Sequence, residues 1–364
     1  MRLETLQLLP VEFSDVEGWE RDDHAAAFAA YLGSARVISE KDDGDCAVRT
    51  AKQALRSAAA GTSRADARRF FESNFRPFRL RNQREAGLLT GYYEPEIAAS
   101  KATSSAFPVP IYARPSDLVN LVAEADRGAR AHEGLTHARQ TADGGLEPFP
   151  TRAEIEQGAL AGLGLELFHA ADAVDVFMMQ VQGSGLLRLP DGRGVRVTYD
   201  GKNGHPYTSI GRYLIDQGQF TPETTTLQAL VSWLKSTPER ARDVMRQNKS
   251  YVFFRIVGPE ETTSALGVQG VPLSAGRSLA VDTAFHALGT PIWVSSPTLS
   301  HAHATGQPFA RLMVAHDVGS AIRGPQRGDV YFGSGAAAGH RAGLTKHPAR
   351  FTVLLPRGET DAER

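Results

Sequence analysis

The segment from Arg311 to Gly335 constrains the fold more than any other part of this 364-residue chain. Its first half, Arg311 to His316, is an apolar run of β-formers that stops at Asp317, as a buried strand does where it meets a loop. In its second half, a turn at Gly324 precedes Asp329 and another apolar run. Two strands that carry a carboxylate at one end, beside glycine-rich backbone, are a common way to build an active site on a β-scaffold.

A third carboxylate follows a short predicted strand upstream, where Ser278 to Val281 ends at Asp282. These three acids, together with the strings GLLTGYYEPE, VQGSG and GKNGHPY, resemble the lytic murein transglycosylase A (MltA) family with its C-terminal three-aspartate (3D) domain. The resemblance runs from about Gly87 to Leu355. It is specific because several separate, unusual strings occur in the same order.

Length and composition limit the classes of protein that fit this chain. The length suggests two domains. Lys and Arg together number 40 and Asp and Glu 41, so there is no basic footprint for nucleic acid. The single Cys46 excludes an internal disulfide and a cysteine metal cage, and we expect no cofactor.

The resemblance implies a mainly β fold with helices, of the α+β class. We expect residues 1–94 and 259–364 to form a helical N-terminal part and a double-psi β-barrel. Residues 95–258 are expected to form an inserted, barrel-like domain, with a groove between the two. The residues themselves predict helices over the first eighty positions, with a capping box at Ser63 and Asp66.

Within the middle section, the pattern predicts an edge strand over Phe107–Arg114 and a loop over Glu133–Phe149. Turn residues between Leu186–Leu189 and Val195–Tyr199 predict a hairpin. The segment from Val174 to Val181 fits a helix and a strand equally well.

The string around Thr90, Gly91 and Tyr92 is a candidate for substrate binding. Thr90 can hydrogen-bond a sugar and Tyr92 can stack on one, but the residues alone favour an ordinary strand with an aromatic in the core. The resemblance implies instead that this string lines the groove facing the aspartates. By the same match, Gly324 belongs to the binding surface.

Two further polar stretches are candidates for glycan binding. Gln182, Gly183 and Ser184 present an amide, a hydroxyl and bare backbone at one point, without the G-x-S-x-G pattern of a serine nucleophile. Lys202 and Asn203 form a polar loop with the same capacity, although a simple turn explains them equally well.

The histidines His301, His303 and His316 could be drawn together as metal ligands. The pair His301 and His303 has no second pair of ligands at a fixed spacing, so we expect surface histidines and no metal.

By match to the family, Asp329 is expected to act as general acid and then as base in a lytic cleavage. Such a carboxyl must hold its proton near neutral pH, so a neighbouring carboxylate or desolvation should raise its pKa. Asp317 is the natural neighbour, or else stabilises positive charge on the sugar. Asp282 is expected to be architectural.

The implied reaction cleaves the β-1,4 bond between N-acetylmuramic acid and N-acetylglucosamine and leaves a 1,6-anhydro ring. Two alternatives stay open: an inverting hydrolase with Asp329 as acid and Asp317 as base, and a non-catalytic murein-binding module.

The implied partners are peptidoglycan glycan strands and proteins of cell-wall synthesis or division, with the enzyme a monomer. The substrate and family imply the periplasm or the periplasmic face of the outer membrane. The N-terminus MRLETLQLLPVEFSD shows no signal peptide or lipidation motif.

Overall fold

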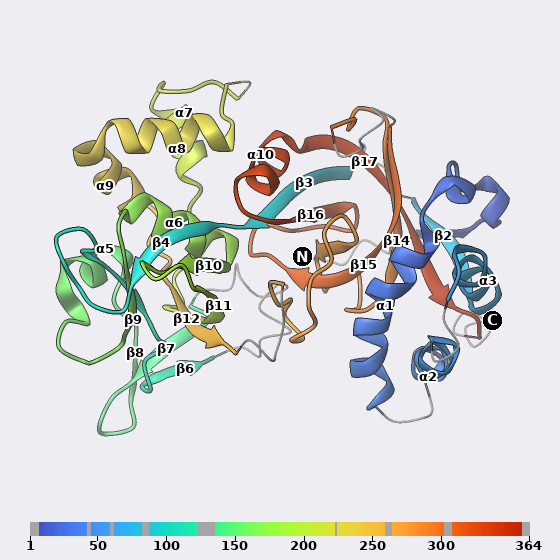
Figure 1. Cartoon of the computed structure of the whole chain (residues 1–364), viewed down its shortest axis with the longest axis horizontal. Helices are drawn as coiled ribbons and strands as arrows, with labels where there is room; N and C mark the ends of the chain where they lie inside the picture. Colours follow the sequence, from blue (N-terminus) through green and yellow to red (C-terminus); the bar gives the residue numbers. More distant parts are fainter. Residues whose placement is uncertain are drawn as a thin grey trace. The chain divides into compact units, whose positions relative to one another are not determined.

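The computed structural model describes residues 7–41, 45–58, 62–81, 87–121, 135–222, 224–258, 264–301 and 308–358. The chain divides into two compact units of mixed α and β structure, which confirms the expected fold class (Figure 1). The first unit contains Met1–Gly91, Leu266–Phe332 and Thr345–Arg364. The second contains Tyr92–Ala265 and Gly333–Leu344.

A closed six-stranded barrel forms the centre of the first unit. Its strands follow the order β17-β14-β15-β13-β16-β3, and β3 pairs back onto β17 to close the ring. The strands predicted at Ser278, Arg311 and Asp329 are all present. The barrel strands are β3 (Gly87–Glu94), β13 (Ser278–Val281), β14 (Pro291–Ser296), β15 (Phe309–Val318), β16 (Arg327–Ser334) and β17 (Lys346–Pro356). Two more strands, β1 (Gln7–Pro10) and β2 (Phe75–Arg81), extend the sheet from β17.

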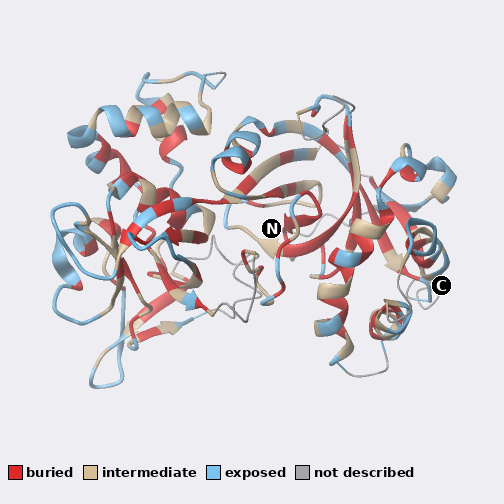
Figure 2. Cartoon of the chain, in the orientation of Figure 1, coloured by how far each residue is buried: buried red, intermediate tan, exposed pale blue. Residues whose placement is uncertain are grey.

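Helices from the first eighty residues cover one side of this barrel. They are α1 (His24–Ser39), α2 (Cys46–Ala58) and α3 (Arg64–Asn74), preceded by short turns η1 (Phe13–Asp15) and η2 (Trp19–Arg21). The predicted capping box is confirmed, since the Ser63 hydroxyl accepts a hydrogen bond from the Asp66 backbone N–H at the start of α3. Trp19, Phe28 and Phe71 are almost completely buried and pack with Trp293 of β14 in one apolar cluster. In Figure 2, much of the barrel ribbon is coloured red for buried.

A buried ion pair fastens the N-terminal segment to the barrel. Asp22 accepts hydrogen bonds from both terminal nitrogens of Arg277, at 2.7 and 2.8 Å, and from the Leu312 backbone N–H at 2.9 Å. The Arg277 guanidinium also donates to the Leu312 carbonyl at 2.9 Å. Each charge is therefore both paired and hydrogen-bonded, which is the condition for burying charges in a protein.

The second unit is built on a six-stranded sheet in the order β12-β11-β10-β4-β9-β5. An isolated bridge between Ala113 and Phe254 joins its two edges, so the sheet is barrel-like as expected. Its strands are β4 (Glu96–Ser100), β5 (Val109–Tyr112), β9 (Glu166–Ala170), β10 (Ser184–Arg188), β11 (Gly194–Lys202) and β12 (Val252–Val257). The hairpin predicted around residues 190–194 is confirmed by the pairing of β10 with β11.

The prediction of a continuous loop over Glu133–Phe149 is wrong at two short strands within it. Residues 133–134 lie outside the described residues, but β7 (His137–Gln140) and β8 (Leu146–Glu147) pair with each other, and β6 (Leu118–Asn120) completes a three-stranded sheet. Tertiary packing buries His137 fully and so overrides the polar, glycine-containing composition of the segment.

Helices account for much of the remaining second unit. The ambiguous segment is a helix, α6 (Ala173–Gln182), because its residues 174 and 176–180 are all buried against neighbouring elements. Gly185 lies so close to it that an added Cβ would meet Met179 Sδ at 2.3 Å. The other helices are α5 (Arg152–Glu154) with the π-type turn η4 (Ile155–Ala159), α7 (Ile210–Asp216), α8 (Leu227–Ser236), α9 (Pro238–Arg246) and α10 (Ala336–Leu344).

Of the helices that the structure describes, none combines the length and the apolar character needed to cross a membrane.

Candidate active site

Asp329 projects from the outer face of the barrel. Successive residues of a strand point to opposite faces, and the neighbouring Gly328 faces the interior. A Cβ added to Gly328 would lie 2.9 Å from Leu279 Cδ1 and 3.0 Å from the Phe351 ring, both buried side chains. Asp329 therefore points away from the packed interior, which leaves its carboxyl available to chemistry.

Thr90 contacts this carboxyl from the adjacent strand β3. Its hydroxyl donates a hydrogen bond of 2.6 Å to Asp329 Oδ1. Desolvation raises the pKa of Asp329, while the Thr90 hydrogen bond and the positive charge of Arg327 act in the opposite direction. The net pKa is above the ordinary value, so the site favours the protonated carboxyl that a general acid requires.

Asp317 reaches the same outer face because of a β-bulge. Ala280 of β13 pairs with Asp329 on one side and with Asp317 on the other. The pairing of β13 with β15 shifts register between Leu279 and Ala280, so that His316 is the extra residue. Simple alternation from the interior partner Ala315 would have turned Asp317 inward, and the bulge turns it outward instead.

The two acids flank Ala280 from the neighbouring strands β15 and β16. Two inter-strand spacings separate their backbones by about 10 Å. Asp317 Oδ1 accepts the Val318 backbone N–H at 2.9 Å. Of the two causes expected to raise the pKa of Asp329, the structure shows desolvation, and Asp317 is not among the groups that shift it.

Asp282 is an anchor for the loop before β16. Its side chain is buried, Oδ2 accepts the Gly324 N–H at 2.8 Å, and Oδ1 accepts the Ala284 N–H at 3.2 Å. Gly324 has a φ of 106°, a conformation that favours glycine. The Arg323 guanidinium lies 3.9 Å from Asp282 Oδ1.

The buried His286 holds the same loop and was not identified from the sequence. Its Nε2 lies 2.7 Å from the Pro325 carbonyl oxygen, to which it donates. Together with Asp282 it fixes the backbone that leads into β16 and Asp329. Nothing in the sequence string around His286 distinguishes it from other histidines, because its partner is 39 residues away.

His316 is not a surface histidine, contrary to expectation. It is 1% exposed, and its Nδ1 lies 2.7 Å from the Ser278 hydroxyl. Ser278 Oγ accepts the Ser274 N–H, so its own proton is free to be donated to His316. Burial lowers the pKa of His316 to about 4, which keeps the imidazole neutral. Of the other candidates, His301 lies near Thr345 and His303 lies outside the described residues.

This lowered pKa predicts loss of stability in acid. Between the ordinary value of 6.5 and about 4, the unfolded chain binds a proton at His316 that the folded chain excludes. The free energy of unfolding should therefore be highest above pH 6.5 and fall by about 1.4 kcal/mol per pH unit from this group as the pH is lowered. Urea unfolding at several pH values measures the slope. His316→Gln, which can still accept from Ser278, should reduce the slope by one proton, whereas the same change at exposed His340 should leave it unchanged.

The second unit holds the other candidate binding residues. Gln182 ends α6, and its side-chain oxygen accepts the Tyr93 backbone N–H at 3.1 Å, which leaves its NH₂ group as the end able to meet a ligand. Gly183 has a φ of 82° and ends the helix. Ser184 is 7% exposed, and Tyr92 is 9% exposed, so neither presents a broad surface.

Asn203 is fully buried and its amide is committed to the protein. Its Nδ2 donates to the carbonyls of Pro150 and Lys249, and its Oδ1 accepts the Tyr251 N–H at 2.8 Å. These three bonds tie the end of β11 to two neighbouring segments. In this structure Asn203 therefore positions backbone, whereas the adjacent Lys202 is half-buried.

Glu94, the glutamate after Tyr93, is a buried charge that the sequence did not single out. It is fully buried, and its carboxylate accepts from Arg196 Nε at 2.9 and 3.1 Å and from the Ser334 hydroxyl at 2.5 Å. This cluster joins the ends of β3 and β16 to β11. Removing either charge would leave the other buried without a partner.

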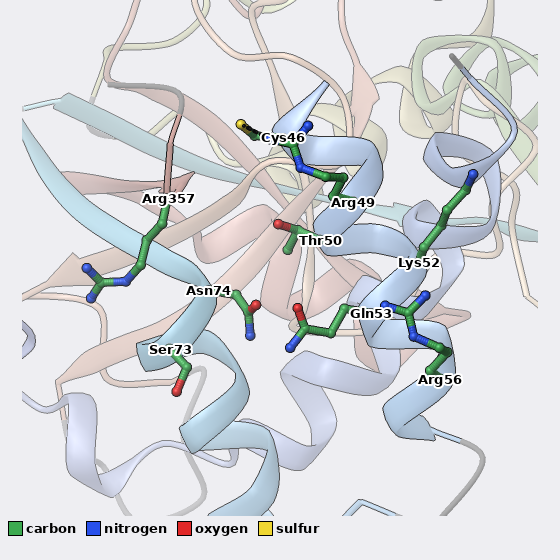
Figure 3. Close-up of a pocket in the computed structure, with 9 residues that line it drawn as sticks. All are labelled: Cys46, Arg49, Thr50, Lys52, Gln53, Arg56, Ser73, Asn74 and Arg357. Atoms are coloured by element: carbon green, nitrogen blue, oxygen red, sulfur yellow. Dashed lines mark hydrogen bonds between the residues drawn. The ribbon is translucent and has the colours of Figure 1, made fainter. Parts of the chain in front are cut away.

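A separate pocket of about 440 Å³ lies on the helical side of the first unit (Figure 3). Its lining includes four cationic side chains, Arg49, Lys52, Arg56 and Arg357. None of its lining residues belongs to a barrel strand that carries the candidate acids. Across the described part of the chain, no group of three or more His, Cys, Asp or Glu side chains is arranged to hold a metal ion.

Comparison with known proteins agrees with these observations. A family model described as the MltA specific insert domain matches residues 88–255, and one described as the 3D domain matches residues 277–355. Membrane-bound lytic murein transglycosylase A of Escherichia coli strain K12 is 37% identical over 268 residues. That match covers 73% of this chain and 64% of the relative, slightly less than two thirds of its length.

Solved structures match over nearly the whole chain. The membrane-bound lytic murein transglycosylase of Agrobacterium tumefaciens is 38% identical, with a TM-score of 0.85 over 98% of this chain and 100% of that one. E. coli MltA with bound chitohexaose is 28% identical, with a TM-score of 0.69 over 98% of this chain and 93% of the other.

Proposed function

The chain belongs to the membrane-bound lytic murein transglycosylase A (MltA) family, and we propose that it cleaves peptidoglycan by a lytic reaction centred on Asp329. The bond is the β-1,4 linkage between N-acetylmuramic acid and N-acetylglucosamine. The product end is 1,6-anhydro-N-acetylmuramic acid. The observation that carries the proposal is the desolvated Asp329, whose pKa is raised on the outer face of the barrel beside Thr90.

In the first step, protonated Asp329 gives its proton to the bridging oxygen as the glycosidic bond breaks. Positive charge develops at the anomeric carbon, and protonation of the leaving oxygen lowers the barrier. The resulting carboxylate is stabilised by the Thr90 hydrogen bond and by Arg327, the two groups that lower its pKa. The Thr90 hydrogen bond and the charge of Arg327 therefore disfavour protonated Asp329 and stabilise the carboxylate that acts as the base.

In the second step, the Asp329 carboxylate takes the proton from the 6-hydroxyl of the same muramic acid. The hydroxyl oxygen attacks the anomeric carbon and closes the 1,6-anhydro ring. The proton returns to Asp329, so one carboxyl completes the cycle and no water is consumed.

The relative with bound chitohexaose supports a glycan ligand for this fold. We assign Gly91 and Gly324 to glycan contact because glycine lets a ligand approach the backbone closely. Gly183, Lys202 and the side-chain NH₂ group of Gln182 are assigned to glycan contact as well. Tyr92, Ser184 and Asn203 are too buried to contact much of a ligand and are assigned to positioning the backbone around them in the second unit. Asp282 holds the Gly324 loop.

An inverting hydrolase is the second candidate, because Asp317 shares the outer face with Asp329. Inverting enzymes place their carboxyls about 6.5–9.5 Å apart, with a water between them. The backbones here are about 10 Å apart, and Asp317 is not among the groups that shift the pKa of Asp329. The lack of coupling between the two carboxyls favours the single-acid reaction.

Product analysis on purified sacculi tests the proposal. Mass spectrometry should find anhydromuropeptides, which are lighter by one water than the products of hydrolysis. Hydrated reducing ends would establish the hydrolase instead. Sedimentation with sacculi without any soluble product would establish a non-catalytic murein-binding module.

Thr90→Val should separate the two effects of Thr90 on the acid. Loss of its hydrogen bond should raise the pKa of Asp329 further, so the fall in activity at high pH should move to higher pH. The rate at the optimum should fall by about 10- to 150-fold, because a hydrogen bond to a charged group is worth about 1.5–3 kcal/mol. A pH–rate profile measures both, and an unshifted profile would contradict the role of Thr90. Thr90→Ser, which keeps the hydroxyl, is the matched control.

The relatives are named membrane-bound murein enzymes, and we propose the periplasm or the periplasmic face of the outer membrane as the place of action. Peptidoglycan glycan strands are the proposed partner, with cell-wall synthesis or division proteins as further partners of a monomer.

A further inference from the structure

We propose that Arg327 binds the free lactyl carboxylate of the muramic acid residue whose glycosidic bond is cleaved. Arg327 would then distinguish muramyl glycan without peptides from neutral polymers of N-acetylglucosamine. The inference rests on the proposed function, because it assumes that this sugar lies against Asp329. Arg327 is a specificity residue in this account and takes no part in proton transfer.

Arg327 and Asp329 lie on the same face of one strand. They are two residues apart in β16, so both side chains project to the outer face, with about 7 Å between their Cα atoms. No ion pair within 4.0 Å joins them among the salt bridges of the described residues. Each nevertheless shifts the pKa of the other through its charge, so the two groups are close without neutralising each other.

The guanidinium of Arg327 has donors to spare. Its hydrogen bond to protein runs from Nη1 to the carbonyl of Gly328, its own neighbour. Guanidinium has five N–H donors in a planar fork that matches a carboxylate. The side chain is half-buried, and desolvation lowers its pKa, so a charge at this position acts more strongly than on an open surface.

The lactyl carboxylate of muramic acid lies close enough to the anomeric carbon to reach a side chain beside Asp329. Muramic acid differs from glucosamine by a lactyl ether on C3, and its carboxylate is the one charge of the peptide-free repeat. C3 belongs to the same ring as the anomeric carbon that Asp329 addresses, so the carboxylate lies a short ether arm to one side of the acid. Attachment of the stem peptide turns this carboxylate into an amide and removes the charge.

Binding of the carboxylate also assists the chemistry. The positive charge of Arg327 lowers the pKa of Asp329 and so opposes the acid form. A carboxylate paired with Arg327 offsets that charge and favours the proton on Asp329 before cleavage. Muramyl substrate thereby favours the protonation state that its own cleavage requires.

A binding experiment in the Asp329→Asn background tests the proposal without turnover, and the Asn amide imitates the protonated acid. The ligands are a tetrasaccharide of alternating N-acetylglucosamine and N-acetylmuramic acid, the same tetrasaccharide with its lactyl carboxylates converted to carboxamides, and chitotetraose. We expect the carboxylate form to bind about tenfold more tightly than the other two, as a charge-assisted bidentate pair would. Equal affinity of the carboxylate and carboxamide forms would overturn the proposal, and this comparison needs no change at Arg327.

Variants at Arg327 then test whether this residue causes the preference for the carboxylate ligand. In the same background, Arg327→Gln should abolish the tenfold preference, and Arg327→Lys should keep part of it because it retains charge without the fork. Arg350→Gln removes an exposed arginine elsewhere in the barrel and should leave the preference intact. Retained preference in a folded Arg327→Gln variant, or loss of preference in Arg350→Gln, would overturn the assignment.

Product assays separate this proposal from the proposed function. If the wild-type enzyme, with Asp329 intact, releases no anhydro product, the lytic reaction is refuted. The binding preference measured in the Asp329→Asn background still decides the role of Arg327. If anhydro product forms while peptide-linked and peptide-free strands are cleaved equally by both the wild type and Arg327→Gln, the role of Arg327 alone is refuted.

Discussion

Replacement of Asp329 by Asn is expected to lower the release of anhydromuropeptides by about 10²–10⁴-fold, the usual contribution of a general acid or base. The loss should fall at the high end of this range, because in the proposed reaction one carboxyl serves both proton transfers. The amide keeps the size of the side chain and can still meet the Thr90 hydroxyl, so folding should be retained. Product quantification by mass spectrometry and sedimentation with sacculi measure release and binding separately.

Two further variants serve as comparisons for Asp329→Asn. Asp191→Asn changes an exposed aspartate in the β10–β11 turn and should release product at the normal rate. Asp317→Asn should slow the reaction less than Asp329→Asn, because the proposed reaction assigns no proton transfer to Asp317. Normal release by Asp329→Asn would refute the assignment, and equal loss in both variants would favour the two-carboxylate hydrolase.

Asp22→Ala should lower the free energy of unfolding by about 3–5 kcal/mol, the cost of leaving one partner of a buried ion pair without the other. Arg277 would keep its bond to the Leu312 carbonyl but lose both bonds to the carboxylate. The Leu312 N–H would lose its acceptor as well. Urea denaturation followed by far-UV circular dichroism measures the change.

The neighbouring residue supplies a matched control for this prediction. Asp23→Ala removes an exposed N-cap that accepts the Ala26 N–H and should cost only about 1 kcal/mol. The double variant Asp22→Ala with Arg277→Met should recover much of the loss, since no unpaired charge stays buried. Equal costs for Asp22→Ala and Asp23→Ala would show that the buried pair does not stabilise the N-terminal anchor.

Sequence reasoning succeeded where local chemistry decides the outcome. The hairpin of β10 and β11 follows from turn residues between two β-prone runs, and the capping box at Ser63 follows from spacing alone. It failed over Glu133–Phe149, where two very short strands are held by pairing with β6 and by burial of His137. Pairing between separate segments leaves no periodic signal in so few residues.

The candidate site was likewise only partly predictable from the sequence. The strings around Thr90 and Asp329 were recognisable, yet their direct hydrogen bond joins residues 239 positions apart and is visible only in the fold. Glu94 and Arg327 stand inside recognisable strings, but no local pattern assigns either of them a role, and the partner of His286 is 39 residues away. The sequence leaves Asn203 open between a ligand contact and a simple turn, and its three partners in the structure are backbone groups of the protein.

What the amino-acid order determined was the identity of the strands and of the acids at their ends, since β-propensity, turns and carboxylates are local properties. The direction in which those acids point was instead set by the packing and pairing of distant strands. The bulge at His316 turns Asp317 to the outer face, and interior packing of Gly328 against Leu279 and Phe351 turns Asp329 the same way. Such directions depend on register between distant strands, and one extra residue reverses the face that a side chain occupies.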